Sequence, residues 1–421
     1  MATPKKTSKK ASAKDEGQPS VNVGLVGHVD HGKTTLTERL SGRWTDTHSE
    51  EVKRGITIRL GYADASFYYC DSCKEYLSKP RCPECGSDTR FVRKVSFVDA
   101  PGHESLMATM LSGATIMDGA LLLVAANEKC PQPQTREHLM ALDMADIDNV
   151  IVVQNKVDVV SEERALEHYG QIKEFLKGTR YEEAPVIPVS AQHGANMGSL
   201  IQAVEERIPT PDRDDSKDPQ MVVARSFDIN KPGIQPEDLK GGVLGGAVLQ
   251  GKLKVGDDIE ISPGRVVEEH NQQVAKPLRT KVTGIMTGGS PVEGVVPGGS
   301  IALMTSLDPG VAKSNHLSGS VVGLEGKLPP VWYEFRLKTH LLDRVVGSQT
   351  DLEVEPVKKN EMLMLNVNAA ATVGIVTDLS KGVITCRLKL PVCADVGSAV
   401  TISRRIGTRF RLIGYGVIQE K

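Results

Sequence analysis

One stretch of the 421-residue chain has the residue types and the spacing of a phosphate-binding loop. The sequence GHVDHGKT at residues 27–34 fits G-x-x-x-x-G-K-[ST] and lies between an apolar run and a helical pattern. Its glycines let backbone N–H groups approach phosphate oxygens, and the N-terminus of the following helix favours an anion. We expect the Lys33 ammonium to contact the β- and γ-phosphates and the Thr34 hydroxyl to bind Mg²⁺. By itself the motif predicts a nucleoside triphosphate site and does not select the base.

Two later motifs are expected at the γ-phosphate and its metal ion. DAPG (99–102) follows the apolar run 95–98, so Asp99 can hold Mg²⁺ through water and the Gly102 N–H can reach the γ-phosphate. RGITI supplies Thr57, whose hydroxyl can complete the Mg²⁺ shell only when the γ-phosphate is present. A loop held in this way is ordered with GTP and released with GDP. The alternative is that Thr57 is only a strand residue.

Two further motifs select guanine. NKVD (155–158) follows the apolar run 150–153, and the Asp158 carboxylate can accept hydrogen bonds from guanine N1 and N2 that adenine does not offer. SAQ (190–192) offers the Ala191 N–H to guanine O6. Because the four motifs follow strands in this order, we predict a GTP site. The residues expected at the nucleotide are Asp30, His31, Gly32, Lys33, Thr34, Thr35, Gly102, Asn155, Lys156, Val157, Asp158, Ser190, Ala191 and Gln192.

Residues beside these motifs are candidates for catalysis and for a second cation. His103 follows DAPG directly and could orient the attacking water or stabilise charge on the γ-phosphate; the alternative is a loop histidine without a catalytic role. His103, Thr57 and Lys33 therefore form the expected catalytic set. Asp30 places a carboxylate inside a phosphate-binding loop. It can face solvent, or it can share a second cation with the triphosphate, with the Gly55 carbonyl as a further ligand.

Four of the seven cysteines form a metal-binding pattern. Cys70-x₂-Cys73-x₈-Cys82-x₂-Cys85 contains two C-x-x-C knuckles, which predict a closed tetrahedral zinc site. Four protein ligands leave no coordination position open, so the expected role is structural. An iron–sulfur cluster or four free thiols are the alternatives. The other cysteines lack such spacing and are expected to be small buried hydrophobic residues: Cys130, Cys386 and Cys393.

The elements that carry these motifs alternate between strand and helix. Apolar strands are expected at residues 21–26, 95–98, 120–125, 150–153 and 186–189. A helix is expected from Lys33, and helical periodicity is found at 134–145 and 162–176. Short connections between alternating strands and helices imply right-handed crossovers and a parallel-rich sheet with helices on both faces. The first domain is therefore predicted to be an α/β P-loop GTPase domain.

The remainder of the chain has a different pattern. PTPDRDDSKDP (209–219) is typical of a linker, and residues 220–325 contain short apolar runs interrupted by pairs of glycines. A second break at 326–330 precedes another strand-rich block, so two β-barrel domains are expected. The predicted division is a disordered Lys-rich tail (1–20), a GTPase domain (21–210) with a zinc knuckle (70–85), and β-barrel domains at 211–327 and 328–421.

Composition is that of an ordinary globular protein. Lys and Arg number 51 against 53 Asp and Glu, so any basic surface must be local. Candidates for such a surface are residues 278–281 and 402–411, although a solvated strand face explains either of them alone. The apolar run 120–126 is too short to span a bilayer, the N-terminus lacks a secretory pattern, and the cysteine usage indicates a reducing compartment. A cytoplasmic protein without a membrane partner is expected.

RGITI and DAPGH resemble the translational GTPases, whose elongation-factor members have one GTPase domain followed by two β-barrels. Within that family, GHVDHGKTTL, residues 44–65 and the four-cysteine insertion are similar to the gamma subunits of archaeal and eukaryotic translation initiation factor 2, in their archaeal form. The resemblance extends over residues 21–421 and includes LPPVWYEF at 328–335.

The resemblance implies a GTP-switched carrier of methionylated initiator tRNA to the small ribosomal subunit. Hydrolysis of GTP to GDP and phosphate would convert it to the releasing state. Such a subunit is the core of a heterotrimer, in which alpha docks on the second domain and beta on the GTPase domain. The tRNA acceptor end is expected between the GTPase switches and the second domain. The resemblance also implies that Asp30 and Gly55 are ligands of a second Mg²⁺.

Three alternatives predict different partners. An elongation-type carrier, including one specialised for a modified aminoacyl-tRNA, would bind elongator tRNAs without alpha and beta subunits. The regulatory GTPase of a metabolic enzyme, such as a sulfate-activating complex, would lack affinity for tRNA. The cysteine insertion and LGYADA (60–65) argue against both through the resemblance. A non-enzymatic zinc-ribbon nucleic-acid binder would leave four nucleotide motifs unexplained.

Overall fold

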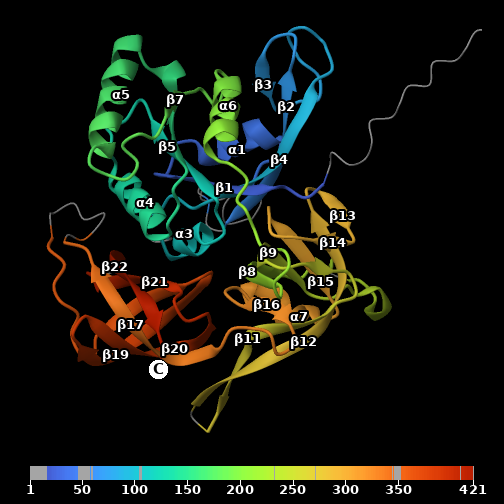
Figure 1. Cartoon of the computed structure of the whole chain (residues 1–421), viewed down its shortest axis with the longest axis vertical. Helices are drawn as coiled ribbons and strands as arrows, with labels where there is room; N and C mark the ends of the chain where they lie inside the picture. The colour runs from blue at the N-terminus through green and yellow to red at the C-terminus, as the bar shows by residue number, and fades with distance from the viewer. Residues whose placement is uncertain are drawn as a thin grey trace, which may run out of the picture.

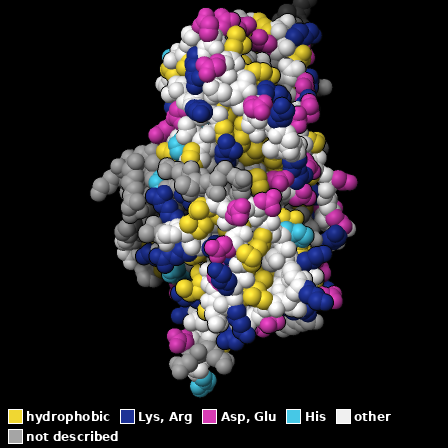
Figure 2. Space-filling view, turned by 90° about the vertical axis from the view of Figure 1, so that its left-hand side faces the viewer, with side chains coloured by type: hydrophobic (Ala, Val, Ile, Leu, Met, Phe, Trp, Pro, Cys, Tyr) yellow, Lys and Arg dark blue, Asp and Glu magenta, His cyan; other side chains and the backbone are white. Residues whose placement is uncertain are grey.

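The computed structural model contains an α/β domain that packs against two β-domains lying side by side (Figure 1). It describes residues 17–45, 57, 60–103, 107–231, 233–270, 272–343, 345, 352–407 and 409–420. Within these ranges, the helices are too short or too polar for any of them to cross a lipid bilayer. On the face shown in Figure 2, basic and acidic side chains are interspersed over the α/β domain above and the third domain below. Neither sign of charge dominates this face, as expected for a chain whose net charge is only -2.

The first domain is built on a sheet with the strand order β3-β2-β4-β1-β5-β6-β7. Strands β4, β1, β5, β6 and β7 are parallel, whereas β2 and β3 extend the sheet in the antiparallel sense. The predicted parallel-rich sheet is therefore confirmed, and the antiparallel hairpin at its edge is an addition to the prediction. The strands are β1 (Val21–Gly27), β2 (Gly61–Cys70), β3 (Glu75–Leu77), β4 (Arg90–Asp99), β5 (Gly119–Ala125), β6 (Val150–Asn155) and β7 (Val186–Pro188).

Helices cover both faces of this sheet. Side chains of α1 and α6 pack with one face, and those of α3, α4 and α5 pack with the other. Helix α5 has the predicted bounds and begins after Ser161, whose hydroxyl accepts a hydrogen bond from the Arg164 N–H. Helix α4 begins with a proline at its first position, one residue before the predicted start. The helices are α1 (Lys33–Ser41), α3 (Met107–Ala114), α4 (Pro133–Met144), the short η2 (Val157–Val159), α5 (Glu162–Leu176) and α6 (Met197–Arg207).

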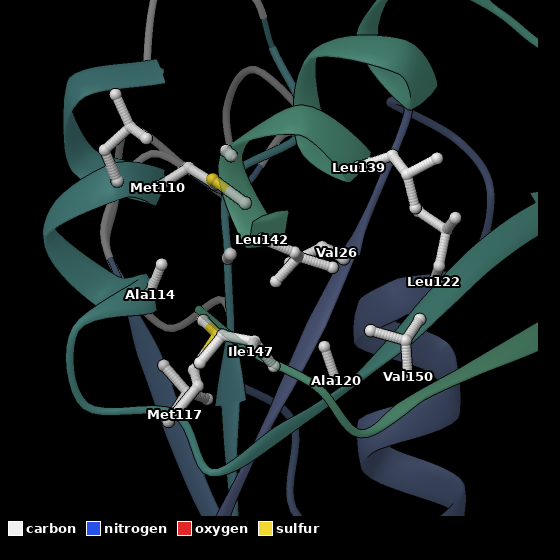
Figure 3. Close-up of a cluster of buried hydrophobic side chains, with 14 of the residues drawn as sticks. Val26, Met110, Ala114, Met117, Ala120, Leu122, Leu139, Leu142, Ile147 and Val150 are labelled. Carbon is white, nitrogen blue, oxygen red and sulfur yellow. The ribbon is translucent and has the colours of Figure 1, made fainter. Parts of the chain in front are cut away.

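Strand β5 explains why some strand segments are apolar at every position, with no alternation between apolar and polar residues. Its side chains alternate between two cores, with Leu122 on the α4 side and Leu121 on the α1 side, and every one of its residues is buried. Figure 3 shows the first of these cores, where Met110 of α3 and Leu139 of α4 meet Val26 of β1 and other strand residues.

The second domain is a closed ring of six strands in the order β11-β16-β8-β9-β15-β12, with β13 added beside β12. Its strands are β8 (Gln220–Phe227), β9 (Val243–Gln250), β10 (Leu253–Lys254), β11 (Asp258–Glu269), β12 (Gln272–Thr287), β13 (Ser290–Val292), β14 (Gly294–Val295), β15 (Ile301–Thr305) and β16 (Val321–Leu324). Its short helices are η3 (Pro236–Asp238), α7 (Pro309–Ala312) and η4 (Lys313–Asn315).

The third domain is a closed barrel in the order β17-β20-β19-β18-β21-β22. Its strands are β17 (Val331–Leu341), β18 (Met362–Val367), β19 (Ala370–Ser380), β20 (Val383–Cys393), β21 (Ala399–Ile406) and β22 (Arg409–Gln419). The expectation of two β-barrels is confirmed. The predicted domain limits agree with the breaks between α6 and β8 and between β16 and β17, but they stay a prediction.

Each β-domain has a core of its own, and one hydrophobic cluster extends across all three domains. The cluster beneath α3 and α4 includes Ala224 of the second domain and Leu412 of the third. Beside Leu412, the Arg411 guanidinium lies 2.6 Å from the Glu137 carboxylate of α4.

The end of the expected N-terminal tail also takes part in domain contacts. Gln18 exchanges two side-chain hydrogen bonds with the backbone of Val296, and the Gly299 N–H donates to the Pro19 carbonyl at 2.7 Å. The prediction of a disordered segment up to residue 20 is therefore wrong for residues 17–20, because these residues bind the second domain; residues 1–16 lie outside the described residues.

Candidate nucleotide and metal sites

The predicted phosphate loop connects β1 to α1 in a conformation that requires glycine. Gly32 has a φ of 88°, and a Cβ there would overlap the Asn155 side-chain amide. Gly27 has a φ of 137°, and its N–H donates to His138 Nδ1 at 2.6 Å. Helix α1 starts at Lys33, directly after the loop, so its N-terminus points into the loop as the sequence predicted.

Lys33 and Gly102 meet at the loop although they are far apart in sequence. The Lys33 ammonium is buried and donates to the carbonyls of Gly27 at 3.0 Å and His28 at 2.8 Å. A Cβ on Gly102 would lie 2.5 Å from this ammonium. Only glycine at position 102 therefore leaves room beside Lys33, in the place expected for a γ-phosphate.

Three oxygen-bearing side chains converge at the start of α1. The Thr34 hydroxyl donates to the Asp99 carboxylate at 2.8 Å and lies 3.2 Å from the Thr57 hydroxyl. Neighbouring ligands in an Mg²⁺ octahedron with bonds of about 2.0–2.1 Å lie about 2.9 Å apart, so the two threonine hydroxyls fit neighbouring ligand positions. Asp99 beside them fits the predicted contact with Mg²⁺ through water. A fourth group, the Thr45 hydroxyl, donates to the same carboxylate at 2.7 Å, and no sequence motif identified it.

The motifs expected at guanine also come together. The buried Asn155 side chain donates to the His31 carbonyl at 2.9 Å and accepts from the Ala191 N–H at 3.0 Å, so it joins the phosphate loop to the SAQ loop. The Ala191 N–H predicted for guanine O6 is thus directed at Asn155. The Asp158 side chain is 24% exposed and lies 3.5 Å from His193. The remaining predicted members follow the same strands: Lys156 directly before η2, Val157 as its first residue, and Ser190 and Gln192 in the SAQ loop.

Buried histidines support the back of the phosphate loop. The His31 ring is buried and contacts the Leu123 carbonyl at 2.8 Å and Glu128 at 3.2 Å; burial lowers its pKa to about 4. Only the backbone of His31 is therefore available to a nucleotide. Burial likewise lowers the pKa of His138 to about 3, so the neutral ring accepts the Gly27 N–H. His138 was not found from the sequence because its apolar surroundings depend on the fold.

The remaining predicted site residues are Asp30, Gly55, Thr35 and His103. Asp30 is exposed with a φ of 63°, which agrees with a side chain in solvent. Its suggested cation partner, Gly55, lies outside the described residues. Thr35 lies in the first turn of α1, and His103 follows Gly102 and is half-buried.

The four cysteines of the knuckle form one cluster. Their sulfur atoms all lie within 4.8 Å of one another, with Cys70 and Cys85 at 3.5 Å and Cys73 and Cys82 at 3.8 Å. Four ligands at about 2.3 Å from a tetrahedral zinc ion lie about 3.8 Å apart, so the cluster fits zinc. The remaining cysteines are buried as expected: Cys130, Cys386 and Cys393.

A cavity of about 330 Å³ separates the first domain from the second. Thr45 and Tyr62 line it from the first domain, and Arg225, Phe227 and a series of glycines line it from the second. The Tyr62 hydroxyl is buried there and has no hydrogen-bond partner among the described residues. This buried hydroxyl can therefore form a further hydrogen bond.

Comparison with known proteins gives two family matches. Residues 18–210 match the model described as "Elongation factor Tu GTP binding domain", and residues 333–418 match "Initiation factor eIF2 gamma, C terminal". The chain is 58% identical over 403 residues to translation initiation factor 2 subunit gamma of Pyrococcus furiosus, covering 96% of this chain and 98% of that one. It is 56% identical over 409 residues to the Methanocaldococcus jannaschii protein of the same name, covering 97% and 100%.

A solved structure also has this three-domain arrangement. A bacterial selenocysteine-specific elongation factor superposes with a TM-score of 0.71 at 24% identity, and the match covers 94% of this chain. The chain spans 58% of the length of that protein. At this identity the likeness shows a common fold alone.

Proposed function

Because this chain belongs to the gamma subunit family of translation initiation factor 2 and is a translational GTPase, we propose that it carries methionylated initiator tRNA to the small ribosomal subunit. In this proposal GTP permits tRNA binding in the cytoplasm, and hydrolysis to GDP and phosphate causes release. The observation that carries the proposal is the position of Thr45. Its hydroxyl contacts Asp99 of the metal site, and the same residue lines the cavity between the first and second domains.

The proposed nucleotide chemistry assigns a role to each converging group. Lys33 binds the β- and γ-phosphates, His103 orients the attacking water, and Thr57 joins Thr34 and Asp99 around Mg²⁺. The Mg²⁺ ion, when bound, neutralises charge on the β- and γ-phosphates. Loss of the γ-phosphate would release Thr57 and disturb its neighbours around Asp99, and Thr45 would transmit this change to the cavity.

The proposed base recognition rests on Asp158. Its carboxylate would accept hydrogen bonds from guanine N1 and N2, in exchange for the contact with His193. Replacing Asp158 by Asn should weaken GTP binding and shift the preference toward xanthosine nucleotides, because the amide can donate to the second oxygen of xanthine. GTP affinity that is unchanged in this variant would contradict the assignment.

The cavity suits the aminoacylated end of a tRNA. Tyr62, Phe227 and Met286 line it with apolar side-chain area, and Arg225 and Asp64 supply charged groups. Glycines at 245–246 and 288–289 leave backbone groups accessible to a ligand. An ester-linked methionine and the terminal ribose together require this mixture of apolar and polar contacts.

Exposed apolar side chains support the proposed subunit contacts. On α5 and beside it, Leu166, Tyr169 and Val159 are 66%, 43% and 61% exposed, and we propose that this face of the GTPase domain binds beta. On the second domain, Ile229 and Leu239 border a cavity of about 610 Å³, which is proposed for alpha. Leu166→Asp should prevent copurification with beta, whereas Leu390→Asp, on the third domain, should not.

Binding of two tRNAs tests the carrier function. The chain, with alpha present, is titrated with methionylated initiator tRNA and with methionylated elongator tRNA, using a GTP analogue and then GDP. We expect selective binding of initiator tRNA with the analogue only. Equal binding of both tRNAs would favour an elongation-type carrier, and no binding would favour a regulatory GTPase of a metabolic enzyme.

A further inference from the structure

The loop proposed to read guanine O6 is held by helix α1 as well as by the strand that carries Asn155. We propose that Arg39 is a positioning residue for guanine recognition, which holds Ala191 and Gln192 in place from the last turn of α1. This inference rests on the proposed guanine site and assigns a role to a residue outside its four motifs.

Direct contacts carry the inference. Arg39 Nε donates to the Ala191 carbonyl at 2.9 Å, and Arg39 Nη2 donates to the Gln192 carbonyl. The planar guanidinium can address two successive carbonyls at once, which a lysine ammonium on a flexible chain cannot do with the same geometry. Arg39 therefore fixes two consecutive peptide units of the SAQ loop.

A glycine closes the loop beside the arginine side chain. Gly194 has a φ of 72°, a conformation that favours glycine, and a Cβ there would make an ordinary van der Waals contact of 3.4 Å with Arg39 Cδ. The Gly194 N–H donates to the Ser190 carbonyl at 2.7 Å and closes the turn that presents Ala191. Arg39 therefore packs against a turn whose shape depends on glycine.

Ala191 is held from both sides. Its N–H donates to Asn155 Oδ1 at 3.0 Å, and its carbonyl accepts from Arg39. Without Arg39, the loop would keep the Asn155 contact and its internal turn but lose both carbonyl contacts to α1. In the proposed complex, guanine O6 takes the place of Asn155 Oδ1 as the acceptor of the Ala191 N–H. Small displacements of the loop would weaken that new hydrogen bond, because hydrogen bonds depend steeply on geometry.

The placement of Arg39 also links the two halves of the nucleotide. Helix α1 begins with Lys33 and Thr34 at the phosphate side, and Arg39 lies six residues further along the same helix. At 1.5 Å per residue this is a rise of roughly 9 Å. Helix α1 therefore fixes the distance between the phosphate site and the loop proposed to contact the guanine base.

Two variants and a matched control distinguish a positioning role of Arg39 from an effect of its positive charge alone. Arg39→Ala removes the contacts, whereas Arg39→Lys keeps the positive charge at the end of the helix and removes the planar group. The control is Arg207→Ala, because Arg207 occupies the last turn of α6 in the same way and is exposed. Thermal unfolding of each variant shows whether the fold is intact.

The readout is the binding of three nucleotides, measured by displacement of a fluorescent GDP derivative. 6-Thio-GDP weakens the acceptor at position 6, and IDP lacks the 2-amino group that Asp158 would read. For Arg39→Ala we expect GDP affinity to fall about tenfold, with a smaller loss for 6-thio-GDP, so that the preference for GDP over 6-thio-GDP shrinks. The preference for GDP over IDP should stay the same, Arg39→Lys should behave like Arg39→Ala, and Arg207→Ala should behave like the wild type.

Other outcomes would overturn the inference. If Arg39→Ala and Arg39→Lys keep the wild-type preference for GDP over 6-thio-GDP, Arg39 does not position the O6 contact. A uniform loss for all three nucleotides, together with a lower unfolding temperature, would indicate a merely structural role. If the wild type itself binds IDP as tightly as GDP, the proposed guanine site fails, and this result is distinct from failure of the Arg39 inference alone.

Discussion

The ion pair between Glu137 and Arg411 is expected to be a major contribution to the packing of the first domain on the third. The Glu137 side chain is 1% exposed and that of Arg411 is 14% exposed, with 2.6 Å between their charged groups. Burial raises the pKa of Glu137, and the guanidinium counteracts this effect. Arg411→Met removes the cation but keeps a side chain of similar length, so the carboxylate would be left buried without its partner.

The expected cost follows from this burial. Removing one member of a buried ion pair usually destabilises a protein by about 3–5 kcal/mol. If the carboxyl group is protonated instead, the cost is about 1.4 kcal/mol for each unit by which the solution pH exceeds the ordinary pKa of a glutamate. Replacing both residues, as Glu137→Leu with Arg411→Met, creates an apolar pair beside Leu412 in the shared core. The double variant should therefore be within about 1 kcal/mol of the wild type.

The assay is a double-mutant cycle on the free energy of unfolding in urea at pH 7.5. We expect a coupling energy of at least about 2 kcal/mol between positions 137 and 411. The control is Lys358→Met, which breaks the exposed pair with Glu355 and should leave the unfolding free energy unchanged within error. The reasoning is refuted if the double variant loses as much stability as the two single variants together, because burial would then not determine the cost.

Three further predictions concern the buried histidines, the knuckle and hydrolysis. Burial holds the pKa of His31 and His168 at about 4 and that of His138 at about 3, below the ordinary value of 6.5, so the unfolded chain binds protons that the folded chain excludes. The free energy of unfolding should fall as pH decreases from 6.5 toward 4, by up to about 1.4 kcal/mol per pH unit for each histidine; equal urea midpoints at pH 7.5 and 5.5 would contradict this. The purified chain should contain one zinc ion, which Cys73→Ser should release with a lower unfolding temperature but unchanged GDP affinity; a folded wild type free of zinc would exclude the metal site. His103→Ala should slow GTP hydrolysis in a single-turnover assay without weakening GTP binding, and an equal loss of both would exclude a catalytic role.

Local patterns predicted most of the first domain and its motifs. The apolar run at 21–26 is β1, and the periodic segment 162–176 is α5. Each motif comes directly after a strand, and parallel strands bring their carboxyl ends to one edge of the sheet. The meeting of Lys33, Gly102 and Asn155 at one loop could therefore be expected from the order of the motifs. The clustering of the four cysteines was equally predictable, because short C-x-x-C turns need no distant support.

Several contacts and elements of the structure could not be predicted from any local pattern in the sequence. Thr45 contacts Asp99 across 54 residues, and Arg39 contacts Ala191 across 152 residues, without belonging to any motif. Strand β2 alternates between buried and partly buried positions, but its sequence signal is weak because the buried positions 63 and 65 are alanines, which are uncommon in strands. The polar composition of residues 17–20 predicts a disordered tail, since composition does not reveal a contact with a surface more than 270 residues away.

Residue types at short spacing predict which chemistry is available: a phosphate loop, groups for guanine, oxygen ligands for Mg²⁺ and four thiolates. The folded structure establishes which of these groups share surroundings. It buries His138 behind the loop, places Tyr62 at a cavity between domains and brings Thr45 to both the predicted metal site and that cavity. Burial and long-range contact depend on the path of the whole chain, so spacing along the sequence carries no information about them.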